Sequence, residues 1–285
     1  MKLKFLGFAL LAVCVCAVCC MCGSDSKTPD YEFPDGPDPD PDPQPGDYPA
    51  GLTVTEFTDD LGGGKQCLGF VAVADLKANP KLRFNAVHLP QQKIPSRIHA
   101  EFASANRGTA CVTTNAGYWW AGNSLSLLVT GGTVKSIENQ TVTRNNQTVY
   151  PVRSSFGQMA SGGFETHWIY CVLDDGNKPY AFPSALDNDE RTNTYMSAPP
   201  TSKTPGAVLW TPQEAVGGGP MLVKEGKNVA VENYWKEVFD GGGIAGTSRQ
   251  PRTAIGATAD GKLILLVCDG RNMRGSAGFT LAELA

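Results

Sequence analysis

The chain has 285 residues, of which 41% are hydrophobic and 18% are charged, and its formal net charge is −4 at pH 7. This composition excludes a wholly disordered chain and provides enough apolar material for a sizeable core. The acidity lies in residues 24–50, so the sequence beyond residue 50 keeps 21 basic and 20 acidic residues of the 24 and 28 in the whole chain. A folded part near +1 excludes nucleic-acid binding by bulk charge, and we expect no nucleic-acid partner.

Residues 1–22 are predicted to be a lipoprotein signal peptide. Two lysines precede an apolar run from Phe5 to Val18, which is too short to span a membrane comfortably as a mature helix. Five cysteines lie in this leader, and such a cluster resembles a bacterial lipoprotein signal. Cys22 is the predicted lipidation site, Cys19 or Cys20 could compete with it, and an ordinary cleaved signal peptide is the alternative. We therefore expect an exported protein that a lipid anchor attaches to the membrane of the bacterial cell envelope.

Residues 23–50 form a predicted linker that is rich in proline and aspartate. Proline favours the extended polyproline II conformation and the aspartates repel one another, so this segment can build no core of its own. No second linker and no fixed-period repeat follow. We therefore expect one folded domain over residues 51–285.

The folded part is predicted to be mostly β-structure. Short β-branched or aromatic runs that end at Gly, Asp or Asn predict strands. IPSRIHAEFASAN predicts an amphipathic helix with Ile98, Phe102 and Ala105 on one face, and NYWKEVF predicts a short second helix. Because regular strand–helix alternation is missing, we expect an α+β fold, a single β-rich domain with a mixed or antiparallel sheet and a few helices. The predicted strands are LGFVAVADL, LRFNAVHL, TACVTTNAG, LSLLVTGGTV, HWIYCVLDDG, PMLVKEGKNVAV, RTAIGAT and KLILLVCDG.

Four cysteines lie beyond the leader, Cys67, Cys111, Cys171 and Cys268, each in or beside an apolar run. None forms a C-x-x-C pair, so their spacing predicts no zinc site. An exported location permits a disulfide, but buried thiols are the favoured interpretation for most of them. We predict no metal site and no cofactor.

A polar turn follows the predicted strand TACVTTNAG. Asn115 ends the strand, Gly117 permits a tight turn, and Tyr118 begins a run of three aromatic residues. Consecutive side chains point in different directions, so the three rings cannot all enter one core. An exposed ring here would suit a sugar face or an interface.

Two further segments leave alternatives open. Residues 182–211 are predicted to form a long irregular excursion, which is either functional or a family-specific insertion. The glycines Gly217, Gly218 and Gly219 can turn successive N–H groups toward an anion, although a tight turn before a hairpin is the more usual interpretation. The similar run in DLGGGKQ lacks the first glycine and the Ser or Thr of a P-loop, which argues against ATP binding.

The segment RTAIGATADGKLILLVCDGR is predicted to be a hairpin with polar groups at one end. A two-residue turn at Asp260-Gly261 would place Thr253 opposite Cys268 and Arg252 opposite Asp269. Arg271 would lie close by, so two arginines and one aspartate would leave positive charge for an anion. Arginine suits phosphate or carboxylate, and an anion site and a structural ion pair are equally compatible with this pattern.

The candidate acids near these motifs are Glu232 and Asp269. The sequence holds no G-x-S-x-G motif, and its three histidines are far apart, so a nucleophilic triad is not indicated. Paired carboxylates would fit glycoside chemistry, but the sequence does not give their separation.

Taken in order, the motifs TTNAGYWW, SLLVTGGTV, SSFG, AVGGGPMLVKEGK, PRTAIGATADGKLILLVCDGR and FTLAELA resemble the phosphodiester glycosidase family, the family of the mannose 6-phosphate uncovering enzyme. The resemblance covers most of the chain from about residue 52 to the end. It implies hydrolysis of a sugar-1-phosphodiester, with a phosphorylated glycan or sugar-1-phosphodiester as the substrate partner. The alternative is a noncatalytic glycan-binding envelope lipoprotein.

The resemblance also implies roles for particular residues. The predicted catalytic set is Glu232, Asp269, Arg252 and Arg271, in which the arginines hold the phosphate and an acid serves as base or stabilises the sugar cation. The predicted substrate-binding set is Asn115, Gly117, Tyr118, Gly218, Gly219 and Thr253. On this basis we expect Arg252→Ala to abolish turnover and leave the fold intact.

The end of the chain departs from the family pattern. Thr280 and Glu283 form a capping box, which marks a helix start, yet only Leu284 and Ala285 follow. Related chains continue into a strand and a glycine-rich motif, so we expect the domain to be truncated here.

Overall fold

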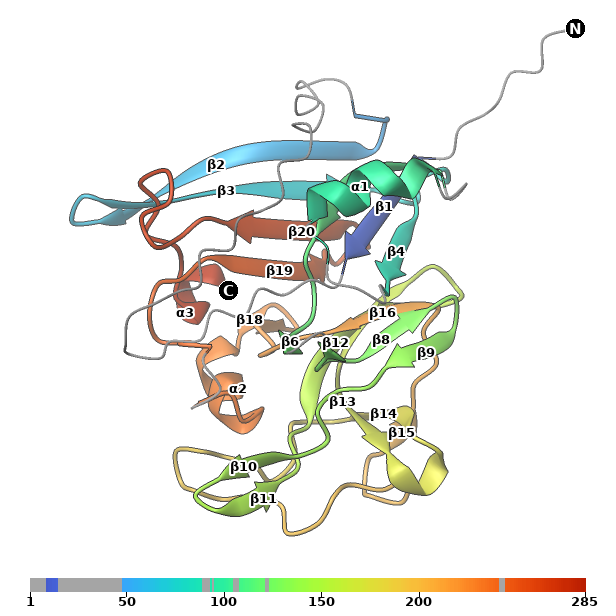
Figure 1. Ribbon diagram of the computed structural model, residues 1–285, viewed down its shortest axis with the longest axis vertical. Helices are drawn as coiled ribbons and strands as arrows, with labels where there is room; N and C mark the ends of the chain where they lie inside the picture. The colour runs from blue at the N-terminus through green and yellow to red at the C-terminus, as the bar shows by residue number, and fades with distance from the viewer. Residues whose placement is uncertain are drawn as a thin grey trace, which may run out of the picture.

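The computed structural model describes residues 9–14, 48–88, 93, 95–104, 108–120, 123–240 and 244–285 (Figure 1). The described part is rich in β-structure and contains a few short helices, as predicted. Its α-helices are α1 (Pro95–Ser104), α2 (Ala230–Lys236) and α3 (Leu281–Leu284). The predicted lipidation site Cys22 and the predicted helix residue Ala105 lie outside the described residues. None of these helices is both long enough and apolar enough to cross a membrane.

The largest sheet has seven antiparallel strands in the order β15-β14-β13-β12-β16-β8-β9. The interior strand β13 is buried on both faces, because Ile169 and Cys171 pack in one apolar cluster while Trp168 and Tyr170 pack in another. This explains why HWIYCV reads as an almost continuous apolar run. The strands are β8 (Leu128–Thr130), β9 (Thr133–Ser136), β12 (Arg153–Gln158), β13 (Phe164–Val172), β14 (Lys178–Phe182), β15 (Val208–Leu209) and β16 (Glu214–Gly217).

A four-stranded antiparallel sheet has the order β19-β20-β3-β2 and lies above the seven-stranded sheet in Figure 1. Its longest strand, β2, was not among the predicted strands, because LTVTEFTDDLG is mostly polar and exposed. The strands are β2 (Leu52–Gly62), β3 (Lys65–Ala74), β19 (Arg252–Ala257) and β20 (Leu263–Cys268).

A third, parallel sheet has the order β4-β1-β5. Here β1 (Ala9–Cys14), from the predicted leader, lies between β4 (Phe84–Val87) and β5 (Thr109–Thr114). Helix α1 buries Ile98 and Phe102, which confirms the predicted apolar face at these two positions. The described part therefore combines antiparallel sheets with one parallel sheet.

One apolar cluster joins the three sheets. Leu265 from β20, Phe84 from β4 and Phe156 from β12 pack in the same cluster, and the rings of Phe84 and Phe156 meet edge to face at a centroid distance of 6.0 Å. The remaining strands form small hairpins outside this core. They are β6 (Trp119–Trp120), β7 (Asn123–Ser124), β10 (Val142–Arg144), β11 (Gln147–Val149), β17 (Val223–Lys224) and β18 (Lys227–Asn228), with a 3₁₀ turn at Leu173–Asp175.

The predicted register of the β19–β20 hairpin is wrong by one residue. Arg252 is opposite Cys268, and Thr253 is opposite Val267. The connection is a three-residue loop, because the N–H of Thr258 donates to the carbonyl of Lys262 and Gly261 takes φ of 87°, as in a turn followed by a bulge. Side chains alternate along a strand, so the Arg252 side chain shares a sheet face with Cys268, and Asp269 points to the other face.

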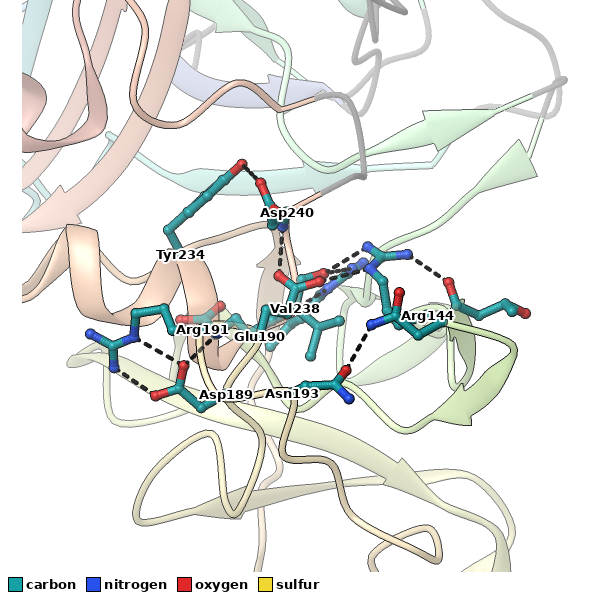
Figure 2. A network of polar contacts seen from close by, with 12 residues as sticks. Arg144, Asp189, Glu190, Arg191, Asn193, Tyr234, Val238 and Asp240 are labelled. Atoms are coloured by element: carbon teal, nitrogen blue, oxygen red, sulfur yellow. Dashed lines mark hydrogen bonds and ion pairs between the residues drawn. The ribbon is translucent and has the colours of Figure 1, made fainter.

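The long excursion over residues 183–207 is tied to the rest of the molecule by buried polar contacts (Figure 2). Glu190 accepts from Nε of Arg144 on β10 at 2.7 Å and from the N–H of Asp240 at 2.6 Å. Asp240 in turn accepts from the Tyr234 hydroxyl of α2 at 3.0 Å. Glu190 thus fixes the excursion to the β10–β11 hairpin and to the segment that follows α2.

Candidate functional site

The turn after β5 packs directly against the glycine turn that ends β16. A Cβ atom on Gly117 would lie 2.5 Å from the Cβ of Ser126 and 2.8 Å from the carbonyl oxygen of Gly217. Only glycine therefore permits this approach. The hydroxyl of Tyr118 then donates to the carbonyl of Gly219 at 2.6 Å. This hydrogen bond joins the turn after β5 to the glycine turn, which lies about 100 residues later in the sequence.

The N–H groups of the glycine turn face protein carbonyls. Gly217 donates to Leu127 at 2.7 Å, and Gly218 donates to Ser154 at 3.1 Å. In this structure these two groups are therefore not free to bind the phosphate, which differs from the expected anion cradle. Gly219 has φ of 108°, and Gly218 has open space where a Cβ would lie.

A buried carboxylate that the sequence did not indicate supports the glycine turn. Glu237 follows α2 and is 0% exposed. Its Oε1 accepts from Trp168 Nε1 at 3.0 Å and from the Met221 N–H at 2.8 Å, and its Oε2 accepts from the N–H and hydroxyl of Ser154 at 2.8 and 3.0 Å. This one side chain therefore connects β12, β13 and the segment after Gly219.

Arg153 on β12 completes this support from the other side. Its Nε and Nη2 donate to the carbonyls of Glu237 and Val238 at 3.2 and 3.0 Å, and its guanidinium lies 4.3 Å from the ring centroid of Phe239. Burial lowers the pKa of this guanidinium, while the nearby Tyr118 and Glu237 groups act in the opposite direction. Arg153 thus caps the C-terminal end of α2 instead of facing solvent.

The protonation of Glu237 predicts a pH dependence of stability. Burial raises the pKa of Glu237 to about 7, against the lowering effect of its hydrogen bonds. Because the folded pKa exceeds that of the unfolded chain, the folded state holds the proton more tightly between these values. The protonated Glu237 carboxyl thereby contributes on the order of 3 kcal/mol to the free energy of unfolding. This contribution is fully present below pH 4.5 and is lost as the pH rises through 7.

Urea unfolding of the full chain at pH 5 and pH 7.5 tests this prediction. We expect the free energy of unfolding to fall with rising pH by about 2 kcal/mol more in the wild type than in Glu237→Gln, which cannot titrate there. An equal pH dependence in both proteins would contradict the assignment.

Arg252 anchors the segment that leads into its own strand. Its Nε donates to the carbonyl of Phe279, Nη1 to that of Ile244, and Nη2 to those of Ala245 and Ser248, at 2.9–3.1 Å. These contacts use four of the five donors of a guanidinium. Burial lowers the pKa of Arg252, and the nearby Tyr118 raises it. Arg252 thus lies within electrostatic range of Tyr118 and has a structural role as well.

Arg271 follows β20 and keeps more of its hydrogen-bonding capacity. Its side chain is exposed, and Nε donates to Oε1 of Gln250 at 2.9 Å. Among the described residues its Nη atoms make no hydrogen bond. Its charge is also near enough to lower the pKa of the Arg252 guanidinium. Arg252 and Arg271 therefore lie within electrostatic range of each other, and Arg271 is the more exposed of the two.

The predicted acids point away from these arginines. Asp269 accepts from Nε of Arg274 at 2.6 Å, and Arg274 also bonds Glu56 at 3.0 Å. Glu232 lies on the exposed side of α2 and pairs with Lys236 at 2.6 Å. The predicted contact between Arg252 and Asp269 is absent from the described contacts, because the register differs and Asp269 lies on the other sheet face.

Thr253 and Asn115 meet on the opposite face of β19 from Arg252. The Thr253 hydroxyl donates to Oδ1 of Asn115 at 2.7 Å, and Asn115 also accepts from the Thr114 hydroxyl at 3.3 Å. This contact fixes the first turn to the hairpin. Both predicted substrate-binding residues therefore serve at least to position the turn that carries Tyr118.

The predicted capping box at the end of the chain is present. The Thr280 hydroxyl accepts from the N–H of Glu283, and the Glu283 carboxylate accepts from the N–H of Thr280. Arg249 binds the same carboxylate, with its Nη2 at 2.6 Å, and the Leu281 N–H donates to the Gly246 carbonyl. The short helix α3 is thus held by tertiary contacts, which explains why so few residues form a helical turn.

Comparisons with known proteins agree with the motifs over part of the chain. A solved structure, the crystal structure of a hypothetical protein from Synechocystis, aligns with a TM-score of 0.41 and 18% identity over 82% of this chain and 53% of that one. This chain thus spans about half the length of that protein. No curated protein matches. The family model described as Phosphodiester glycosidase matches residues 175–285. The glycine turn, Glu237, Arg252 and Arg271 all fall in this range, so the part of the chain that is similar to the phosphodiester glycosidase family contains these residues of the candidate site.

Proposed function

We propose that this protein is a hydrolase that cleaves a sugar-1-phosphodiester, of the GlcNAc-1-phosphodiester kind, into free sugar and a phosphomonoester. The observation that carries this proposal is the meeting of three motifs that lie far apart in the sequence. Tyr118 is bonded to Gly219 and is near enough to Arg252 to raise the pKa of its guanidinium, and both Gly219 and Arg252 lie in the part that matches the family.

The chemistry of the substrate fits the charges at this place. A phosphodiester carries one negative charge and its phosphate leaves readily, so breaking the sugar C–O bond requires charge stabilisation more than strong proton donation. Arg271 would bind the phosphate through its open Nη groups, and Arg252 would add a second positive charge. A fixed guanidinium pair is well suited to this task.

The sugar would be held by the aromatic turn. Tyr118 packs against Phe239 with ring centroids 5.4 Å apart, so its hydroxyl is held in place. Trp120, two residues further on, is 51% exposed. We propose that a ring of this turn carries the sugar face. Glu232 and Asp269 remain the proposed acids. Loss of turnover in Asp269→Asn but not in Glu232→Gln would identify Asp269 as the acid that the reaction uses.

Arg271→Ala should weaken substrate binding without a change in stability. Loss of charge-assisted hydrogen bonds to phosphate lowers kcat/KM by about 10- to 100-fold, mostly through KM, and an exposed side chain contributes little to folding. Steady-state release of free sugar measures the first effect, and thermal unfolding measures the second.

Arg191→Ala is the control for this variant. It also removes an exposed arginine, but its guanidinium is paired with Asp189 and is not among the candidate site residues. We expect kcat/KM within about threefold of the wild type, the effect of a small energetic change. Equal losses in both variants would show that Arg271 has no specific role.

We also propose that the protein is exported and lipid-anchored through Cys22 in the cell envelope, so that the leader, which includes β1, is present only in the precursor. This proposal is based on the leader, in which two lysines precede a short apolar run and a cluster of cysteines. Growth with a labelled fatty acid should label the chain, and Cys22→Ala should remove the label. Labelling that survives in this variant would place the anchor at another residue.

A further inference from the structure

Two cysteines that the proposed reaction does not use lie on one face of the four-stranded sheet. Cys67 is on β3 and Cys268 is on the neighbouring β20, where Cys268 is opposite Gly69. Side chains two residues apart on a strand share a face, so Cys67 is the diagonal neighbour of Cys268. Both are free thiols in this structure, they are near enough to influence each other's pKa, and they pack in one cluster with Phe279.

We propose that Cys67 and Cys268 form a disulfide across β3 and β20, on the sheet face that carries Arg252. A thiolate of one cysteine attacks a low-molecular-weight or protein disulfide and releases one thiol, and the second cysteine then attacks this mixed disulfide and releases the other. Two protein thiols are oxidised and one external disulfide is reduced to two thiols, so electrons and protons balance.

The burial of the pair indicates when the bond would form. Cys67 is 0% exposed and Cys268 is 5% exposed, and burial raises the pKa of both thiols. Only the thiolate attacks a disulfide, so the folded thiols are unreactive. The bond would therefore form while the chain folds and would then be protected by its own burial.

The other described cysteines do not compete for this pairing. Cys171 lies in the seven-stranded sheet, where its thiol donates to the buried carboxylate of Glu138 at 3.1 Å. Cys111 is on β5 of the parallel sheet and packs against a different cluster. The structure thus favours one pairing among the four cysteines that follow the leader.

The bond would have a mechanical consequence next to the candidate site. Cys268 is directly opposite Arg252, so the link would hold the end of the hairpin against β3. It would also connect residues that are far apart in sequence, and such links restrict the unfolded chain strongly. This inference does not depend on the proposed hydrolase activity, and its test contains no substrate.

Peptide mapping of the full chain gives a direct test. The protein is unfolded and reduced, refolded with a mixture of oxidised and reduced glutathione, alkylated with iodoacetamide, and digested with trypsin without reduction. Cleavage at lysine and arginine places Cys67 in peptide 66–77 and Cys268 in peptide 263–271, apart from all other cysteines. We expect these two peptides to be recovered as one linked species that reduction separates.

Two results would overturn the proposal. One is recovery of both peptides as separate alkylated thiols after oxidative refolding, and the other is linkage of either one mainly to a peptide with Cys111 or Cys171. Oxidised wild-type protein should also unfold at least about 5 °C above reduced wild-type protein, whereas Cys67→Ser should show no such difference. Equal midpoints in the two wild-type forms would contradict the link, and this comparison does not require the variant to fold.

Discussion

Replacing Arg252 with lysine will lower kcat/KM for a sugar-1-phosphodiester by about 10³-fold and will also destabilise the fold by about 2–4 kcal/mol. Lysine keeps the charge beside Tyr118 but cannot reach four carbonyl groups in the fork geometry of a guanidinium. The carbonyls of Ile244, Ala245, Ser248 and Phe279 would then lose their shared donor. Sugar release and urea unfolding measure the two effects.

The hydrogen bonds of Arg252 to four carbonyl groups revise the expectation that Arg252→Ala leaves the fold intact. The family resemblance implies that Arg252 holds the phosphate, whereas in the structure it also holds residues 244–248. Arg191→Lys is the matched control, because Arg191 is exposed and, among the charged groups that the structure describes, pairs only with Asp189. A stable Arg252→Lys protein with normal turnover would refute both roles.

Gly219→Ala should have the second large effect. Its φ of 108° is unfavourable for alanine, and the new Cβ would lie 2.6 Å from Oε2 of Glu237 and 2.8 Å from the ring of Phe239. Backbone strain and overpacking together lower the free energy of unfolding by about 3 kcal/mol or more. We expect turnover to be lost with the fold of this turn, as measured by chemical unfolding and sugar release.

Gly218→Ala is the control on the adjacent residue. Its Cβ would meet no heavy atom within 4 Å, and its φ is not in the left-handed region. We expect stability within about 1 kcal/mol of the wild type. If Gly219→Ala were as stable as Gly218→Ala, the glycine turn would not have the packing described here.

The sequence predicted the β-rich architecture well because its strands carry local signals. KLILLVCDG and HWIYCVLDDG are apolar runs with clear ends, and both form strands. Strand β2 was missed because it is polar along most of its length and is stabilised by pairing with β3. The hairpin register was missed because the ADG turn permits both two- and three-residue loops, and only tertiary packing chooses between them.

The candidate site could be predicted in part. The meeting of Tyr118 with the glycine turn follows from the ordered motifs, and the structure contains it. Glu237 could not be identified, because its four donors come from three segments that are distant in sequence. Its position in NYWKEVF, directly before Val238 and Phe239, is the one local signal of a buried acid. Sequence patterns likewise do not reveal which N–H groups of Gly217 and Gly218 are already bonded.

Hydrolysis of a GlcNAc-1-phosphodiester by the full chain in ¹⁸O-labelled water tests the central claim most directly. Cleavage of the sugar C–O bond puts the label into the released sugar and leaves the phosphomonoester unlabelled. We predict this result, with its loss in Arg271→Ala at low substrate concentration. Label in the phosphomonoester, or saturable binding of the substrate without release of sugar, would contradict the proposal that this protein is a phosphodiester glycosidase.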